Sequence, residues 1–120
     1  MTAAEVIARV KTLRNPAGDE NDLMRVIGDT EAYLYAKVIA PRDAETPAEI
    51  GMDTELAAPR PWDQLYVLAC LRHIDRRENQ ITNMNNEERE FKEMLSEFGA
   101  WWTRTHRQPG GRLWGPWYGV

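Results

Sequence analysis

Few residues in this chain have types and spacings that support catalysis or metal binding. Cys70 lies three positions before His73, and Asp75 follows two positions later. A cysteine and a histidine at this spacing share one face of a helix and can both approach a metal ion. Two such ligands are too few, because structural zinc takes four, and the only other histidine is His106. We therefore expect no metal site, and a core or interface role for these residues.

A nucleophilic site is disfavoured on similar grounds. A nucleophile needs a neighbouring base and a group that orients that base. Cys70 lies within an apolar stretch, where thiols are usually inert. The sequence has no glycine-rich phosphate loop and no serine-centred elbow. We predict that the protein is not an enzyme and uses no cofactor.

An acidic stretch, EEREFKEMLSE, covers residues 87–97. A run of this kind is typical of a solvated helix face. Its functional alternative is the lining of a channel for DNA, because like charges repel within a Debye length of about 8–10 Å. On that hypothesis Glu88 and Glu97 are the candidate lining residues.

Three arginines, Arg72, Arg76 and Arg77, form a candidate basic face with Arg60. They are candidates for charge contacts between copies of the chain, together with Glu87, Glu90 and Glu93. Surface ion pairs contribute little stability singly, so their expected value is in fixing the register of the contact.

The last residues, GGRLWGPWYGV, combine aromatic side chains with glycines and a proline that disfavour regular structure. Residues 101–120 contain three arginines and no acid. We predict an extended arm over 107–120 that becomes ordered on docking to a partner, because exposed apolar segments mark interfaces. The alternative is that the segment folds back on its own helices. The candidate partner-binding residues are Arg107, Arg112, Leu113, Trp114, Trp117 and Tyr118.

Apolar residues recur at helical spacing in four stretches, which predicts an all-α fold. We expect helices over 2–14, 19–40, 61–81 and 86–106, a long mobile loop at 41–60, and an Asn-rich break at 82–88. A short extended piece at 50–56 is a weaker expectation. The short Asn-rich turn favours an antiparallel hairpin of the two long C-terminal helices. The chain is thus predicted to be a four-helix domain over 1–106 followed by the arm at 107–120.

The predicted core draws on all four helices. Its members share apolar character and a position on the buried face expected from helical spacing. They are Val6, Leu23, Ile27, Leu34, Leu65, Leu68, Phe91, Leu95, Phe98 and Trp102.

Composition sets limits on the class of protein. The chain has 120 residues, 42% of them hydrophobic and 28% charged, which is typical of one globular domain. We expect no membrane span and no secretory signal, since no apolar run is long enough and the first residues lack a basic region. The single cysteine fits a reducing compartment. The net charge of −4 argues against a dedicated binder of duplex DNA.

Two stretches resemble one family. DTELAAPRPWDQLYVLACLRHIDRREN, from residue 53, and FGAWWTRTH, ending at residue 106, are similar to head–tail connector, or adaptor, proteins of tailed phages. The shared pattern is an acidic D-T-E-L, a Pro-x-Pro followed by an aromatic and an acid, then Leu-Tyr, and later two aromatics with Arg-Thr-His. The likeness covers about 53–106. The faces of the last two helices depart from it, with fewer aromatics and asparagines than the family pattern has.

The resemblance implies a structural role in the virion, within the neck adaptor type of the family. Such proteins assemble as a ring, twelvefold, on the portal protein at the capsid vertex, and a neck, stopper or tail protein binds below. Genomic DNA passes through the ring without specific binding. The implied location is the neck of the virion, after synthesis in the host cytoplasm.

The main alternative is a small helical DNA-binding protein, such as a small terminase subunit or a helix-turn-helix regulator. Two short N-terminal helices joined by NPAGDEND favour it. Against it, this connection is acidic, and the second helix has only Arg25 and Lys37 to read a groove. A generic four-helix module for another partner is a third interpretation.

Overall fold

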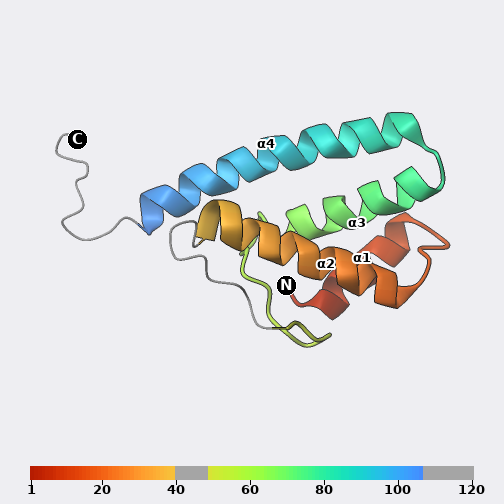
Figure 1. The fold of residues 1–120 in the computed structure, drawn as a ribbon, viewed down its shortest axis with the longest axis horizontal. Coiled ribbons are helices and arrows are strands. Elements are labelled where there is room, and N and C mark those ends of the chain that lie inside the picture. Colours follow the sequence, from red (N-terminus) through yellow and green to blue (C-terminus); the bar gives the residue numbers. More distant parts are fainter. Residues whose placement is uncertain (40–48, 107–120) are drawn as a thin grey trace.

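The structure is a computed structural model that describes residues 1–39 and 49–106. These residues form α1 (Ala3–Leu13), α2 (Glu20–Leu34), a π-helical turn η1 (Tyr35–Ile39), α3 (Gln64–Arg77) and α4 (Ile81–Thr105). The predicted all-α class is confirmed for this part of the chain, which has no strand. Figure 1 shows the elements in chain order.

α1 begins where the sequence predicted. Thr2 caps it, because its hydroxyl accepts from the Glu5 N–H and the Glu5 carboxylate accepts from the Thr2 N–H. This reciprocal pair satisfies two backbone donors that a helix start leaves free. Ala3, Val6, Ile7 and Val10 form its buried face.

α2 and η1 together occupy the predicted second helix. Asp19 caps α2 by accepting from the Asn21 N–H. The α-helix ends at Leu34, and η1 carries helical structure on to Ile39. The predicted end at Ala40 and residues 41–48 of the predicted loop at 41–60 lie outside the described residues.

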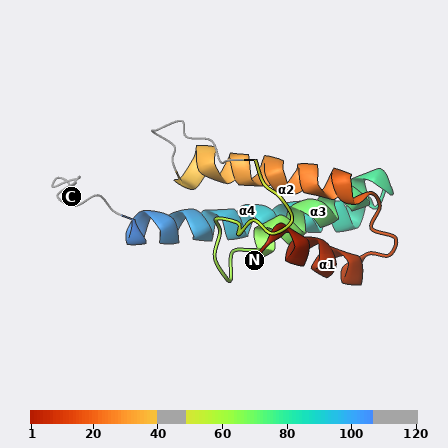
Figure 2. The same ribbon diagram turned by 90° about the horizontal axis from the view of Figure 1, so that it is seen from below.

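α3 is the central helix. Nine of its 14 residues are buried, and it contacts α1, α2 and α4. Figure 2 shows α1 and α2 on opposite sides of it. Apolar residues nearly encircle the first half of this helix, so it must be covered on several sides.

The break before α4 was predicted at 82–88, and this prediction is wrong. The chain turns at 78–80, where Asn79 has a φ of 59° and the Gln80 N–H donates to the Asp75 carbonyl. Asn tolerates this left-handed conformation better than most residues. Asn83, Asn85 and Asn86 lie inside α4 and are exposed. Asn costs a helix only about 0.7 kcal/mol, so α4 starts at Ile81.

The core agrees closely with the prediction. Eight of the ten predicted residues are buried, and Leu95 and Trp102 are partly buried against the same cluster. Twelve buried core residues were not in the predicted set, and Tyr66, Leu56 and Ala58 are among them.

Residues 49–63 cross the molecule from α2 to α3. The Ala4 N–H donates to the Met52 carbonyl, and the Leu56 N–H donates to the Met1 carbonyl. Thr2 and Glu55 form an isolated antiparallel bridge, which is the extended piece expected at 50–56. These bonds tie the segment to the N-terminus, and Leu56 and Ala58 bury their side chains in the core.

Candidate functional site

Aromatic side chains gather where α4 ends. Trp62, which precedes α3, lies with its ring centroid 4.5 Å from that of Trp101 and 5.8 Å from that of Phe98. His106 stacks on Trp102 at a centroid distance of 3.6 Å. Phe98 is fully buried, and the three tryptophans are only partly buried. We call Trp62, Phe98, Trp101, Trp102 and His106 the aromatic end.

The aromatic end brings together the two stretches that carry the family resemblance. Trp62 comes from the first stretch and Trp101 from the second, and their rings are in contact. The chain continues into residue 107 directly from this surface. The candidate docking residues Arg107, Arg112, Leu113, Trp114, Trp117 and Tyr118 lie outside the described residues.

A buried hydrogen-bond cluster anchors the segment that leads to Trp62. The Tyr66 hydroxyl donates to the Glu31 carboxylate and accepts from the Ala58 N–H at 3.0 Å. The second Glu31 oxygen accepts from the Ala57 N–H at 2.9 Å. Burial raises the pKa of Tyr66, and its bond to Glu31 adds to that shift. The cluster therefore fixes residues 57–58 against α2 and α3.

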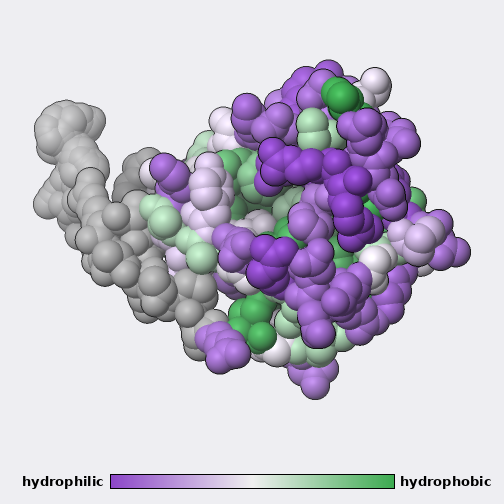
Figure 3. Space-filling model, turned by 45° about the vertical axis from the view of Figure 1, so that its right-hand side comes forward, coloured by the Kyte–Doolittle hydropathy of each residue, from purple (hydrophilic) through white to green (hydrophobic). Residues whose placement is uncertain are grey.

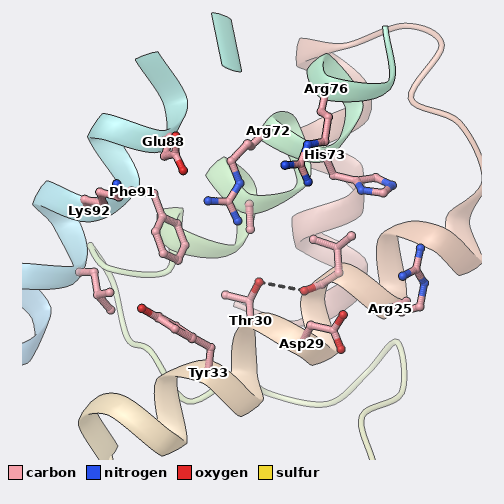
Figure 4. A pocket seen from close by; sticks show the side chains of 13 residues that line it. Arg25, Asp29, Thr30, Tyr33, Arg72, His73, Arg76, Glu88, Phe91 and Lys92 are labelled. Carbon is pink, nitrogen blue, oxygen red and sulfur yellow. Dashed lines mark hydrogen bonds between the residues drawn. The ribbon is translucent and has the colours of Figure 1, made fainter. Parts of the chain in front are cut away.

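A groove of about 510 Å³ lies among α2, α3 and α4. Its apolar lining comes from Phe91, Leu95 and Val26, and Tyr33 stands at its edge, 42% exposed. Figure 4 shows Lys92, Arg72 and Arg76 arranged across it, with Glu88 beside Phe91. On the face shown in Figure 3, hydrophilic side chains predominate, and hydrophobic surface is visible in patches between them. We call the groove among α2, α3 and α4 the basic groove.

Some of the charges that line the basic groove have partners within the molecule. Arg25 donates to Asp22 at 2.6 Å, and the His73 ring nitrogen lies 3.0 Å from the same carboxylate. The bond from Arg25, with that from His73, lowers the pKa of Asp22 to about 2. The Arg72 guanidinium lies 5.3 Å from the Phe91 ring centroid, a cation–π contact.

A second charged cluster is internal. Arg14, which follows α1, donates to both oxygens of Asp75 at 2.8 and 2.7 Å and to Glu87 at 2.8 Å. Asp75 is 2% exposed and Glu87 is 7% exposed. The bond from Arg14 lowers the pKa of Asp75, whereas burial raises that of Glu87 to about 7. The arrangement joins α1, α3 and α4 through one guanidinium.

The predicted charged residues separate into three groups. Arg72, Arg76 and Glu88 line the basic groove. Glu90, Glu93 and Glu97 are exposed on α4, where Glu93 lies 3.7 Å from Arg89. Glu87 does not share this solvated face, because it is buried and accepts a hydrogen bond from Arg14.

Arg77, another member of the predicted basic face, packs against the turn between α1 and α2. A Cβ placed on Gly18 would lie 2.6 Å from its guanidinium. Gly18 also has a φ of 90°, a conformation that glycine adopts without strain. Arg77 therefore covers a turn within its own chain.

Sequence reasoning missed the roles of Arg14, Glu31 and Tyr33. Nothing in the local sequence distinguishes Arg14 from other helix-terminal arginines. The only available signal for Glu31 was an acid in the middle of the apolar face of α2, next to Thr30.

The remaining candidates are the metal-ligating and thiol groups of residues 1–39 and 49–106. These ranges contain no group of three or more His, Cys, Asp or Glu side chains able to hold a metal ion. Cys70 is buried, and desolvation raises the pKa of its thiol to about 12. Over the same ranges, none of the helices has the length and apolar character required to cross a bilayer.

Comparisons with known protein families, with curated proteins and with solved structures found no match to this chain.

Proposed function

We propose that this protein is a head–tail connector of a tailed phage, a structural component that assembles as a ring on the portal protein. The proposed architecture is an antiparallel hairpin of the two C-terminal helices followed by a docking arm at 107–120. In this role the protein extends the DNA channel and presents a surface to the next neck or tail protein. It carries out no catalysis.

The observation that carries the proposal is the aromatic end. Both stretches of the resemblance meet there, through Trp62 and Trp101. Tryptophan, tyrosine and arginine are the residues most often found to dominate binding at interfaces. The partly exposed tryptophans adjoin a segment with two more tryptophans, a tyrosine and two arginines. This composition favours a partner-binding surface over a solvated end.

Many copies in a ring would make weak docking effective. Linked contacts raise the overall affinity without any new contact in the individual arm. Ordering a segment of this length costs conformational entropy, which aromatic anchors can offset when they bury their rings in a partner.

The test is binding to the portal protein encoded in the same genome. The portal ring is mixed with the full chain, with a chain ending at Gln108, and with a full chain in which Trp114, Trp117 and Tyr118 are changed to alanine. Electron microscopy and native mass measurement then report whether a ring is added. The full-length alanine variant is the matched control for the missing length.

We expect a ring with the full chain and none with either variant. A ring formed equally well by all three would retain the connector role and contradict docking by the arm. No association with any of them would contradict the connector role. In that case a mobility shift of duplex DNA that weakens as salt is raised would favour the DNA-binding alternative.

A further inference from the structure

The basic groove carries more positive charge than its own contacts use. Its lining includes four permanent cations, Arg25, Arg72, Arg76 and Lys92, and two acids, Asp29 and Glu88. Arg25 donates a hydrogen bond to the carboxylate of Asp22, which lies outside the groove. Within residues 1–39 and 49–106, Arg76 and Lys92 make no ion pair, and both are exposed. The groove therefore favours an acidic occupant.

α4 carries an acidic ridge on another face. Glu90, Glu93 and Glu97 are spaced at i, i+3 and i+7, so they lie along one side of the helix. All three are exposed, and only Glu93 has an ion-pair partner in the described part of the chain, the exposed Arg89 at 3.7 Å. The ridge spans about 10 Å at 1.5 Å rise per residue.

The groove and the acidic ridge face in roughly opposite directions. α4 contributes Glu88, Phe91, Lys92 and Leu95 to the groove. At 3.6 residues per turn, the mean direction of these positions lies roughly 180° around α4 from that of the ridge. One copy therefore cannot place its own ridge in its own groove.

We propose that the basic groove receives the acidic ridge of α4 from a second copy of this chain. Lys92, Arg72 and Arg76, which Figure 4 labels among the lining side chains, then provide three cations opposite the three carboxylates of the incoming ridge. The apolar lining from Phe91 and Leu95, with Tyr33 at the edge, packs against the aliphatic stems of the incoming side chains. This inference rests on the proposed function and supplies the contact by which its copies join.

The geometry makes the contact heterologous. Each copy uses its groove toward one neighbour and its ridge toward the other, so a pair leaves one groove and one ridge free. Contacts of this type close into rings when the rotation permits and otherwise extend as filaments. The segment 107–120 is a poorer occupant, because it contains Arg107 and Arg112 and no acid.

Charge reversal tests the proposal directly. The groove variant carries Arg76→Glu and Lys92→Glu, and the ridge variant carries Glu90→Lys and Glu93→Lys. Each retains the complementary surface that the other lacks. Sedimentation of the full-length chains, alone and mixed, at low and at high salt measures association. A chain with Arg9→Glu and Lys11→Glu on α1 is the control for a change of net charge.

We expect wild type to associate at low salt and to dissociate at high salt, since exposed ion pairs are screened. The groove variant and the ridge variant alone should bind themselves about tenfold more weakly than wild type, and their mixture should regain association. The α1 control should behave as wild type. Variants that associate as strongly as wild type, or a mixture that stays dissociated, would overturn the proposal.

Disulfide trapping gives a second measurement that does not depend on strong association. A chain with Arg76→Cys is mixed with a chain with Glu93→Cys and oxidised at high protein concentration. The mixed dimer should exceed both homodimers, whereas Arg9→Cys mixed with Glu93→Cys should give no such excess. Native Cys70 is buried, and the unsubstituted chain reports any contribution from it. Absence of the mixed excess would count against the contact even if the chain is monomeric in dilute solution.

The portal-binding experiment and the charge-reversal experiment test the connector role and the groove–ridge contact separately. A ring on the portal that is insensitive to both charge reversals would retain the connector role and remove the groove–ridge contact. Self-association through groove and ridge without portal binding would retain this contact and remove the connector role.

Discussion

At the scale of single residues, the buried charge cluster of Arg14, Asp75 and Glu87 is the most informative feature. One guanidinium serves two carboxylates, and Glu87 Oε1 has no hydrogen-bond partner in the described part of the chain. Desolvation disfavours the charged form of a carboxyl, and the nearby Asp75 and Glu90 add to that effect. Arg14 acts in the opposite direction, and the net result is a raised pKa for Glu87.

Stability should therefore respond to pH through Glu87. Its pKa is about 7 in the folded chain against 4.5 as the reference, so the folded state binds the proton more tightly. Ionising Glu87 therefore lowers the free energy of unfolding. This loss is absent below about pH 4.5, grows as the pH rises, and is complete above about pH 7. Glu87→Gln imitates the protonated form. We expect it to raise the free energy of unfolding at pH 8 by about 1–3 kcal/mol and to change it little at pH 5.

Urea denaturation of wild type and Glu87→Gln at the two pH values measures this difference. Glu97→Gln, at an exposed position of the same helix, is the matched control and should show no comparable pH dependence. A Glu87→Gln chain that is less stable than wild type at pH 8 would mean that the pair with Arg14 outweighs the cost of burial. The pKa of Glu87 would then lie below its reference value.

At the scale of elements, the sequence predicts helices well and their junctions less well. Helical spacing of apolar residues located the starts of α1 and α2 correctly, and in the structure Thr2 and Asp19 cap those starts. The start of α4 was missed because three asparagines resemble a turn. Tertiary contacts decide such cases, and the chain turns at Asn79 instead.

The contents of the sites were predicted less completely than the helices. Arg76 and Glu88 were identified from charge alone, but their place in a common groove depends on how α2, α3 and α4 pack. The burial of Glu87 follows from the packing of Arg14, which lies 73 residues away in sequence. Sequence periodicity reports one helix at a time, so it does not give contacts of this range.

The packing of α4 depends most on Phe98, which is fully buried and lies in ring contact with Trp62, Trp101 and Trp102. Phe98→Ala removes these contacts and leaves a cavity that the neighbouring rings cannot fully close. We expect a loss of about 3–5 kcal/mol in the free energy of unfolding.

Thermal unfolding followed by circular dichroism measures the cost of Phe98→Ala. Ser96→Ala, at an exposed position of α4, is the control and should stay within about 0.5 kcal/mol of wild type. A melting temperature that barely moves in Phe98→Ala would show that the C-terminal part of α4 does not pack on α3 as described.

At the scale of the whole molecule, this small domain has three distinct surfaces that involve α4. They are the basic groove, the acidic ridge and the aromatic end. The basic groove and the acidic ridge face roughly opposite ways across α4. The aromatic end lies at the C-terminal end of the same helix, where Trp101 contacts Trp62. A subunit of a ring needs two lateral contacts and one axial contact, and this placement supplies one surface for each.

The proposed domain boundary at 106 leads to a prediction that separates the two hypotheses for the last residues. The helices α1 to α4 and the buried side chains that join them are all found within residues 1–39 and 49–106, the part that the structure describes. If residues 107–120 dock outward onto a partner, removing them leaves this core intact. If they fold back on the helices, removal exposes apolar surface, and a loss of only 1 kcal/mol lowers the melting temperature of a domain this small by about 4 °C or more.

We expect a chain ending at Gln108 to melt within about 2 °C of the full chain. Tryptophan fluorescence adds an independent measurement, because the shortened chain keeps Trp62, Trp101 and Trp102 and loses Trp114 and Trp117. If the arm is solvated in the free protein, the full chain should emit at longer wavelength than the shortened one. The full-length chain with Trp114→Phe and Trp117→Phe separates the loss of the fluorophores from the loss of the segment. A lower melting temperature on truncation, with blue-shifted emission from Trp114 and Trp117, would place the segment on its own helices and leave the aromatic end as the only axial surface.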